Sequence, residues 1–183
     1  MSYLKKIITA SMLLALCVVF PLAFHAVPYA GRMLLPMHIP VLLAGLVCGP
    51  LLGLVVGLAG PLLSGLLTSM PPMFMVPPMM IELGTYGLVA GLMIKLVHTR
   101  RLSVDLYISL LAAMLAGRIV AGVAQAVYFY GGTYAYAIGT WMSVYFVYSM
   151  PGLVIQLLLI PSLIIALERE KVIPLRYPVS AGA

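Results

Sequence analysis

Charge is scarce in this sequence: only 8% of its 183 residues are Asp, Glu, Lys or Arg. Soluble domains carry roughly 25% charged and about 45–50% apolar residues, whereas 64% of this chain is hydrophobic. The shortage of charge excludes a soluble globular protein. The apolar runs are continuous rather than alternating, which excludes a membrane β-barrel. We therefore expect an all-α integral membrane protein, with residues 1–183 forming a single transmembrane domain.

Cysteine and the common catalytic motifs are also scarce. Cys17 and Cys48 lie inside apolar segments and have neither metal-ligand spacing nor a paired framework, so they indicate core packing. The chain lacks an HExxH motif, a Walker motif and a serine placed beside a base. These absences argue against catalysis, against pumping powered by this chain alone, and against a bound metal or cofactor.

The net charge of +6 does not indicate nucleic-acid binding, because the basic residues are scattered at segment ends rather than clustered on one face. Their placement instead fixes the topology. An excess of Lys and Arg marks the cytoplasmic side of a membrane protein. With both termini inside, the outer loops carry only Arg32, and the number of crossings is even. The inner ends then carry Lys5, Lys6, Lys95, Arg100, Arg101, Arg169, Lys171 and Arg176.

Six apolar segments punctuated by Gly and Pro predict a multi-pass bundle of six transmembrane helices in the cell membrane. The second is short for a core of ~30 Å. The first follows two lysines as a signal peptide would, but it is long and no clear cleavage site follows, so we expect a retained helix. The predicted helices span about 4–24, 37–48, 50–67, 78–97, 103–128 and 140–167.

Glycine and proline shape two of these helices. Gly53, Gly57 and Gly60 share one face of the third helix, and small residues let neighbouring backbones approach closely in lipid. This face therefore predicts tight helix packing. Pro151 and Pro161 predict kinks in the last helix.

The two predicted outer loops, 25–36 and 69–78, are rich in Pro and Met and almost free of charge. Methionine repacks around varied shapes. We expect these loops to fold over the bundle as lids. Passive immersion in the lipid headgroup region is the alternative.

Three ionisable residues lie inside the predicted spans: His38, Glu82 and Arg118. A charge near the bilayer centre costs at least ~2.5–3.5 kcal/mol on insertion scales, so such residues usually mark a function. Counting about 1.5 Å per residue from the helix ends places all three in one outer-leaflet layer, on three helices. The inner halves offer little comparable polarity apart from Gln156. The layer therefore predicts a binding pocket rather than a permeation path.

Aromatic and amide side chains join this layer. Tyr86 follows the glutamate by one turn, and Gln125 follows the arginine by two turns on the same face. Tyr128 and Tyr130 end the fifth predicted helix, and Tyr134 and Tyr136 lie in the loop after it. The last helix begins with Trp141, Tyr145 and Tyr148 at spacings of four and three. An apolar lining with a few convergent polar groups is typical of a small-molecule site. Three alternatives remain open: a structural glutamate–arginine ion pair, a histidine that only caps its helix, and an interfacial aromatic belt.

Three segments also resemble a known family, the substrate-binding S-components of energy-coupling factor (ECF) vitamin transporters. Ser11 and Ala15 have the spacing of the small-xxx-small pattern in that family's opening helix, although the family usually has alanine at both positions. The resemblance covers nearly the whole chain. The segments are 6–16, 35–45 continued by 48–57, and 116–120.

The resemblance implies the high-affinity binding subunit of an ECF-type ABC importer for a vitamin or vitamin precursor. Its partners would be the lipid bilayer, a transmembrane coupling subunit and two ATPase subunits. Ser11 and Ala15 would dock on the coupling subunit, and the substrate would bind beneath the two outer loops.

Side-chain chemistry narrows the expected substrate. Arg118 would bind a carboxylate or hydroxyl, and Glu82 would accept from an amine or ring N–H. We expect a small heteroaromatic, such as a pyridoxine- or hydroxymethylpyrimidine-like compound. Pantothenate and folate remain alternatives. Two further classes are a small intramembrane enzyme, with Glu82 and His38 as acid and base, and a stand-alone channel or exporter.

Overall fold

The computed structural model describes residues 1–23, 33–128, 141 and 143–174, apart from the side chains of 144 and 145. These residues form helices and turns, with no strand among them. Five helices are long and apolar enough to cross a membrane, which confirms the prediction of an all-α membrane protein. They are α1 (Tyr3–Ala23), α4 (Pro50–Thr68), α5 (Val76–Leu96), α6 (Leu102–Tyr128) and α8 (Met150–Arg169). The short elements are α3 (His38–Leu43), the π-helices η1 (Ala44–Cys48) and η3 (Ser143–Tyr148), and the 3-10 helix η2 (Met73–Met75).

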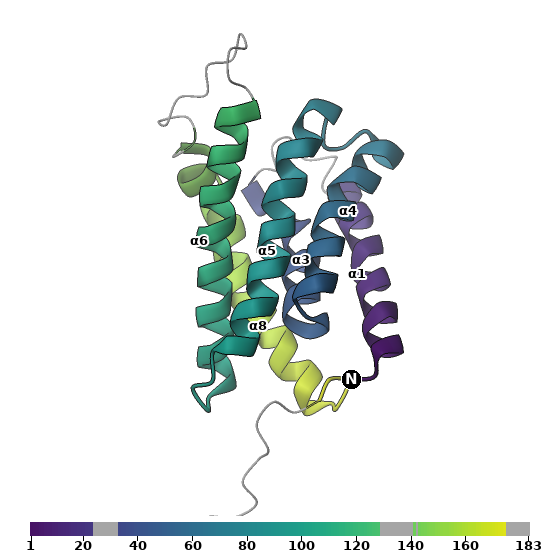
Figure 1. Ribbon diagram of the computed structural model, residues 1–183, viewed down its shortest axis with the longest axis vertical. Helices are drawn as coiled ribbons and strands as arrows, with labels where there is room; N and C mark the ends of the chain where they lie inside the picture. Colours follow the sequence, from purple (N-terminus) through teal and green to yellow (C-terminus); the bar gives the residue numbers. More distant parts are fainter. Residues whose placement is uncertain (24–32, 129–140, 142, 175–183) are drawn as a thin grey trace, which may run out of the picture.

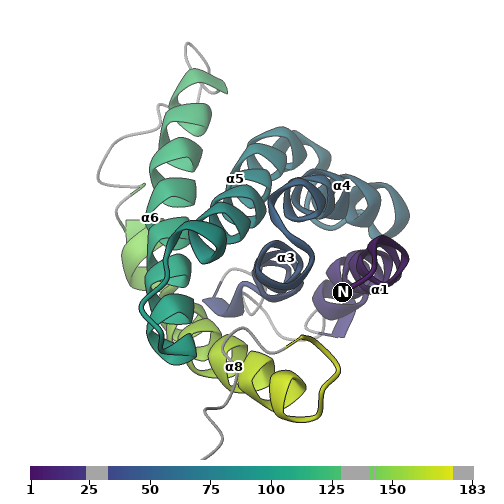
Figure 2. The ribbon, with the colours of Figure 1, turned by 60° about the horizontal axis from the view of Figure 1, so that its bottom comes forward.

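The short apolar helix α3 lies in the middle of the bundle. Figure 2 shows it surrounded by α1, α4, α5, α6 and α8. All six of its residues are buried. Together with η1 it spans His38–Cys48, which is about 17 Å at 1.5 Å per residue. The second predicted helix is therefore present and short, as its sequence indicated.

The two ends of the bundle differ in charge. The N-terminus and the end of α8 lie at the same end, as an even number of crossings requires (Figure 1). Lys5 lies in the first turn of α1, Lys95 lies in the last turn of α5, and Arg169 ends α8. This basic end is the inner end, and η2 lies at the opposite, outer end (Figure 1).

Glycine lets α4 and α5 pack backbone against backbone. A Cβ on Gly53 would meet the Gly87 backbone, and one on Gly57 would meet the Leu83 backbone. The predicted packing role of the glycine face is thus confirmed for these two residues. Gly60 contacts a different helix, because a Cβ there would lie 3.1 Å from Cys17 Cβ in α1.

Gly87→Ala is expected to destabilise the bundle, because the added Cβ would fall on the Gly53 backbone. Overpacking usually lowers the free energy of unfolding by about 1–3 kcal/mol. At roughly 2–4 °C per kcal/mol, the thermal midpoint should fall by several degrees. Thermal unfolding of the detergent-solubilised protein measures it. The control is Ala126→Leu, which adds bulk at an exposed position of α6. Equal midpoints for wild type and Gly87→Ala would contradict this packing.

The last predicted helix is not continuous, so its prediction as one unbroken helix was wrong. The chain forms η3, leaves helical geometry at Ser149 (φ −88°, ψ 0°) and begins α8 at the next residue. Pro151 lies in the first turn of α8, where its missing N–H leaves no hydrogen bond unmade. It therefore starts a helix instead of bending one. Because a π-helix closes i→i+5 bonds, the α-helical spacing expected for the aromatic residues does not hold.

The second predicted loop is shorter than expected. α5 begins at Val76, two residues before its predicted start, and η2 occupies part of the preceding segment. Prolines are tolerated in a first helical turn, which explains the earlier start. Ser64 Oγ donates to the Met70 carbonyl at 2.6 Å, so the segment is tied to the end of α4. Phe74 remains 57% exposed.

The first predicted loop, 25–36, lies mostly outside the described residues. Its last part packs on α8: a Cβ on Gly152 would lie 2.6 Å from the Met33 carbonyl oxygen and 2.9 Å from Leu34. The lid role of both loops remains a prediction.

Candidate functional site

A histidine–glutamate pair lies where α3 meets α5. His38 begins α3, and Glu82 lies in the second turn of α5. Both side chains are buried, and Nε2 of His38 is 3.4 Å from Oε1 of Glu82. A carboxylate only accepts, so the imidazole donates from Nε2, and Nδ1 of the neutral ring remains an acceptor. Depth counting predicted one layer for these two residues, and the structure places them in contact.

Tyr86 joins this pair to α6. Its ring packs edge-on against the His38 ring, with centroids 5.0 Å apart and planes at 68°. The same ring lies against Gly117 of α6, where a Cβ would come within 3.0 Å of it. Tyr86 is 1% exposed, and its hydroxyl has no hydrogen-bond partner in the described part of the chain. Side chains from α3 and α5 thus meet α6 in one cluster.

Arg118 follows Gly117 in α6 and is buried at the same level. Its Nη2 donates to Oγ of Ser149 at 3.1 Å. Its Cζ lies 5.5 Å from the centroid of the Phe146 ring, within cation–π range. Nε has no hydrogen-bond partner among the residues that the structure describes. These contacts go to η3 and the start of α8, so they lend no support to a direct ion pair with Glu82.

Two more predicted site residues lie on the outer side of this cluster. Trp141 packs on α6, where a Cβ on Gly122 would lie 2.6 Å from the indole Nε1. It also contacts Phe146 edge-on, with ring centroids 5.4 Å apart. Gln125 is buried in α6, two turns beyond Arg118. The cluster therefore has an aromatic side formed by Trp141 and Phe146 of η3.

The remaining aromatic residues divide into two groups. Tyr148 is 62% exposed and Tyr128 is 49% exposed, which favours the interfacial belt for both. The others lie outside the described residues: the side chain of Tyr145, and Tyr130, Tyr134 and Tyr136 entirely.

The two predicted docking residues lie on a different side of the protein. Ser11 and Ala15 are both exposed on α1. Of the five long helices, α1 has the smallest buried share of its apolar window. Figure 2 shows it beside α4 and across the central α3 from α6. Its outer face is therefore free for another membrane subunit or for lipid.

Two of the partners of Arg118 were not predicted from the sequence. Ser149 was not singled out, although Ser followed two residues later by Pro is a signal for the start of a helix. Phe146 was missed because the segment was treated as an α-helix. Its five-residue separation from Trp141 suits a π-helix. Gln156 was noted as polar but not assigned to the site, and it is 1% exposed in α8.

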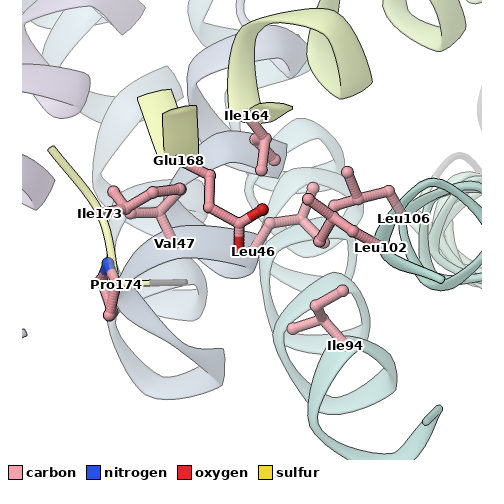
Figure 3. A pocket seen from close by; sticks show the side chains of 9 residues that line it. All are labelled: Leu46, Val47, Ile94, Leu102, Leu106, Ile164, Glu168, Ile173 and Pro174. Atoms are coloured by element: carbon pink, nitrogen blue, oxygen red, sulfur yellow. The ribbon is translucent and has the colours of Figure 1, made fainter. Parts of the chain in front are cut away.

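A separate cavity of about 240 Å³ lies at the inner end of the bundle (Figure 3). The carboxylate of Glu168 points toward Leu46 in this cavity (Figure 3). None of the predicted substrate residues lines it. Its lining comes from η1, α5, α6, α8 and the residues after α8: Leu46, Val47, Ile94, Leu102, Leu106, Ile164, Glu168, Ile173 and Pro174.

This helical membrane bundle buries His38, Glu82, Gln125 and Arg118 near its outer end. Such a group of buried polar side chains is typical of a membrane protein that binds a small molecule. Comparison with known families specifies the class. The chain belongs to the ECF transporter substrate-specific components, whose family profile matches residues 5–164. No curated protein and no solved structure matches the chain.

Family membership confirms the resemblance found in the sequence. The protein is a multi-pass component of the plasma membrane and the substrate-specific binding component of an ECF transporter, not an enzyme. The alternative of a small intramembrane enzyme is therefore excluded. Membership also implies two kinds of partner, a substrate and an ECF module.

Proposed function

We propose that this protein captures a vitamin or vitamin precursor, a small heteroaromatic such as a pyridoxine- or hydroxymethylpyrimidine-like compound. One observation carries the proposal. His38 pairs with Glu82, and Tyr86 packs on the histidine ring. The tyrosine ring also contacts Gly117 of α6, and Arg118 is the next residue in that helix. Burying ionisable groups from three helices in a membrane costs free energy, and a role in ligand binding explains why they are present.

The chemistry of the cluster favours a planar polar ligand. Glu82 can accept from a ring N–H or amine, and the guanidinium of Arg118 can donate to a hydroxyl or carboxylate. Tyr86 and Trp141 supply aromatic faces that stack on or enclose a ring. Pantothenate and folate remain the alternative substrates, because Arg118 would bind their carboxylates.

We also propose that α1 docks on the transmembrane coupling subunit, which in turn works with two ATPases. Ser11 and Ala15 form an exposed small-xxx-small pair, and small residues let helices approach closely in lipid. The residues of the substrate cluster come from other helices. Capture and docking therefore use opposite sides of the bundle.

The most direct experiment is mass spectrometry of small molecules that remain bound through purification of the full-length protein. We expect a vitamin-sized heteroaromatic in stoichiometric amount. The proposal fails if no small molecule is retained and no compound in a vitamin panel binds.

Trp141 provides an optical readout of binding, since it is the only tryptophan in the chain. We expect substrate to change its emission intensity saturably, because the ring lies beside the proposed ligand. The measurement is a fluorescence titration, with calorimetry on Trp141→Phe as the control that separates the reporter from the binding event. Binding by calorimetry without any emission change in the wild type would place the ligand away from Trp141.

A further inference from the structure

Gln156 is a buried amide whose hydrogen-bonding groups are unused within the described structure. The residue is 1% exposed, and neither Nε2 nor Oε1 has a hydrogen-bond partner among the described residues. Such a group loses its hydration without compensation, and proteins rarely retain this arrangement without a reason. The amide offers two donors and an acceptor on one planar edge.

Helix geometry places this amide beneath the Arg118 cluster. Ser149 caps the start of α8 and lies on the same buried face as Gly152 and Gln156 of that helix. Ser149 accepts from Arg118, and Gln156 lies two turns, or about 10 Å, further inward. Helical side chains tilt toward the N-terminus of their helix. Because α8 runs from the outer to the inner end (Figure 1), the amide leans outward toward the cluster.

Buried polar atoms on three other helices also have no hydrogen-bond partner among the described residues: Nδ1 of His38, the hydroxyl of Tyr86 and Nε of Arg118. With Gln156, they come from α3, α5, α6 and α8, one from each helix. Figure 2 shows α5, α6 and α8 in succession around the central α3. The combined set contains acceptors as well as donors, so a ligand that only accepts, such as a simple carboxylate, would leave Oε1 and Nδ1 unpaired.

We infer that Gln156 determines substrate specificity by pairing its amide with a neighbouring donor and acceptor on one edge of a planar heterocycle, such as an aminopyrimidine. The inference rests on the proposed function and narrows it. A ring nitrogen beside an exocyclic amine matches the amide with two hydrogen bonds, whereas a pyridoxine-like ring has no such edge. The paired cluster of His38 and Glu82 then binds the polar substituents at the other side of the ring.

The test compares two probes on the full-length protein in lipid nanodiscs. One is 4-amino-5-hydroxymethyl-2-methylpyrimidine, and the other carries a methyl group in place of the amine. A site built to hydrogen-bond a group strongly rejects the analogue that lacks it. We expect the wild type to bind the amine at least ~10-fold more tightly than the methyl analogue. In Gln156→Leu the amine should bind ~10–100-fold more weakly, and the preference should nearly vanish.

A second measurement separates specificity from a purely structural role. Leucine removes an uncompensated buried amide at similar volume, so the ligand-free Gln156→Leu protein should have the same or a higher thermal midpoint. A lower midpoint, or a variant that keeps the wild-type ratio between the two probes, would overturn the inference. So would a wild type that binds neither probe. If a different vitamin is then found bound to the protein, the proposed function still stands; if none is found, both fail.

Discussion

Arg118→Ala is expected to abolish substrate binding while the protein remains a monodisperse bundle. The guanidinium is buried, is held by Ser149 and Phe146, and keeps Nε for another partner. A hydrogen bond to a charged group contributes about 1.5–3 kcal/mol. Losing one or two such bonds weakens binding by at least ~10–100-fold, at about 1.4 kcal/mol per tenfold. Calorimetric titration measures the effect, and size-exclusion chromatography reports on folding.

Two variants sharpen this test. Arg118→Lys keeps the charge but loses the planar fork of donors, so it should bind detectably yet more weakly than the wild type. Arg101→Ala removes an exposed arginine at the inner end and should leave binding unchanged. Wild-type affinity in a well-folded Arg118→Ala protein would remove the arginine from the site.

Ala15→Trp and Ser11→Trp are expected to block uptake while sparing substrate binding. Both positions are exposed on α1, so a bulky ring there disturbs no core contact but prevents a close helix–helix approach. Uptake in cells that contain the ECF module should fall to the level of cells without its ATPases. Binding by the purified variants should match the wild type.

The matched control for α1 is Val123→Trp, which places the same ring on α6 at a residue that is 61% exposed. It should affect neither binding nor uptake, because it faces lipid away from α1. Undiminished uptake by both α1 variants would refute the docking role of this helix. Impaired binding would show instead that α1 shapes the substrate site.

The helices that the sequence predicted well are those whose ends carry strong local signals. α4 begins at Pro50, as predicted, because Gly49 at φ 105° precedes a proline suited to a first helical turn. The last helix was predicted as one unbroken helix because hydrophobicity is continuous across the break before α8. An apolar run does not distinguish a π-turn from an α-turn, and it does not reveal that Ser149, where the break lies, accepts a hydrogen bond from Arg118.

The candidate site was predictable in its layer but not in its pairing. Counting residues placed His38, Glu82 and Arg118 at one depth, since rise per residue is a property of any α-helix. It gave no rotation about the helix axes, and rotation decides which side chains meet. The contact of His38 with Glu82, rather than of Arg118 with Glu82, therefore required the packed structure. The role that we propose for Gln156 was missed for the same reason.

The central position of α3 has a consequence for how this protein is made. The helix and η1 together cover about half of a ~30 Å membrane core, and α3 begins with a histidine buried against Glu82. In isolation such a segment would expose a polar ring and unsatisfied helix ends to lipid. It is sheltered only once the surrounding helices have assembled (Figure 2). Biogenesis therefore has an order: the long helices enter the bilayer on their own hydrophobicity, and α3 takes its place as they close around it.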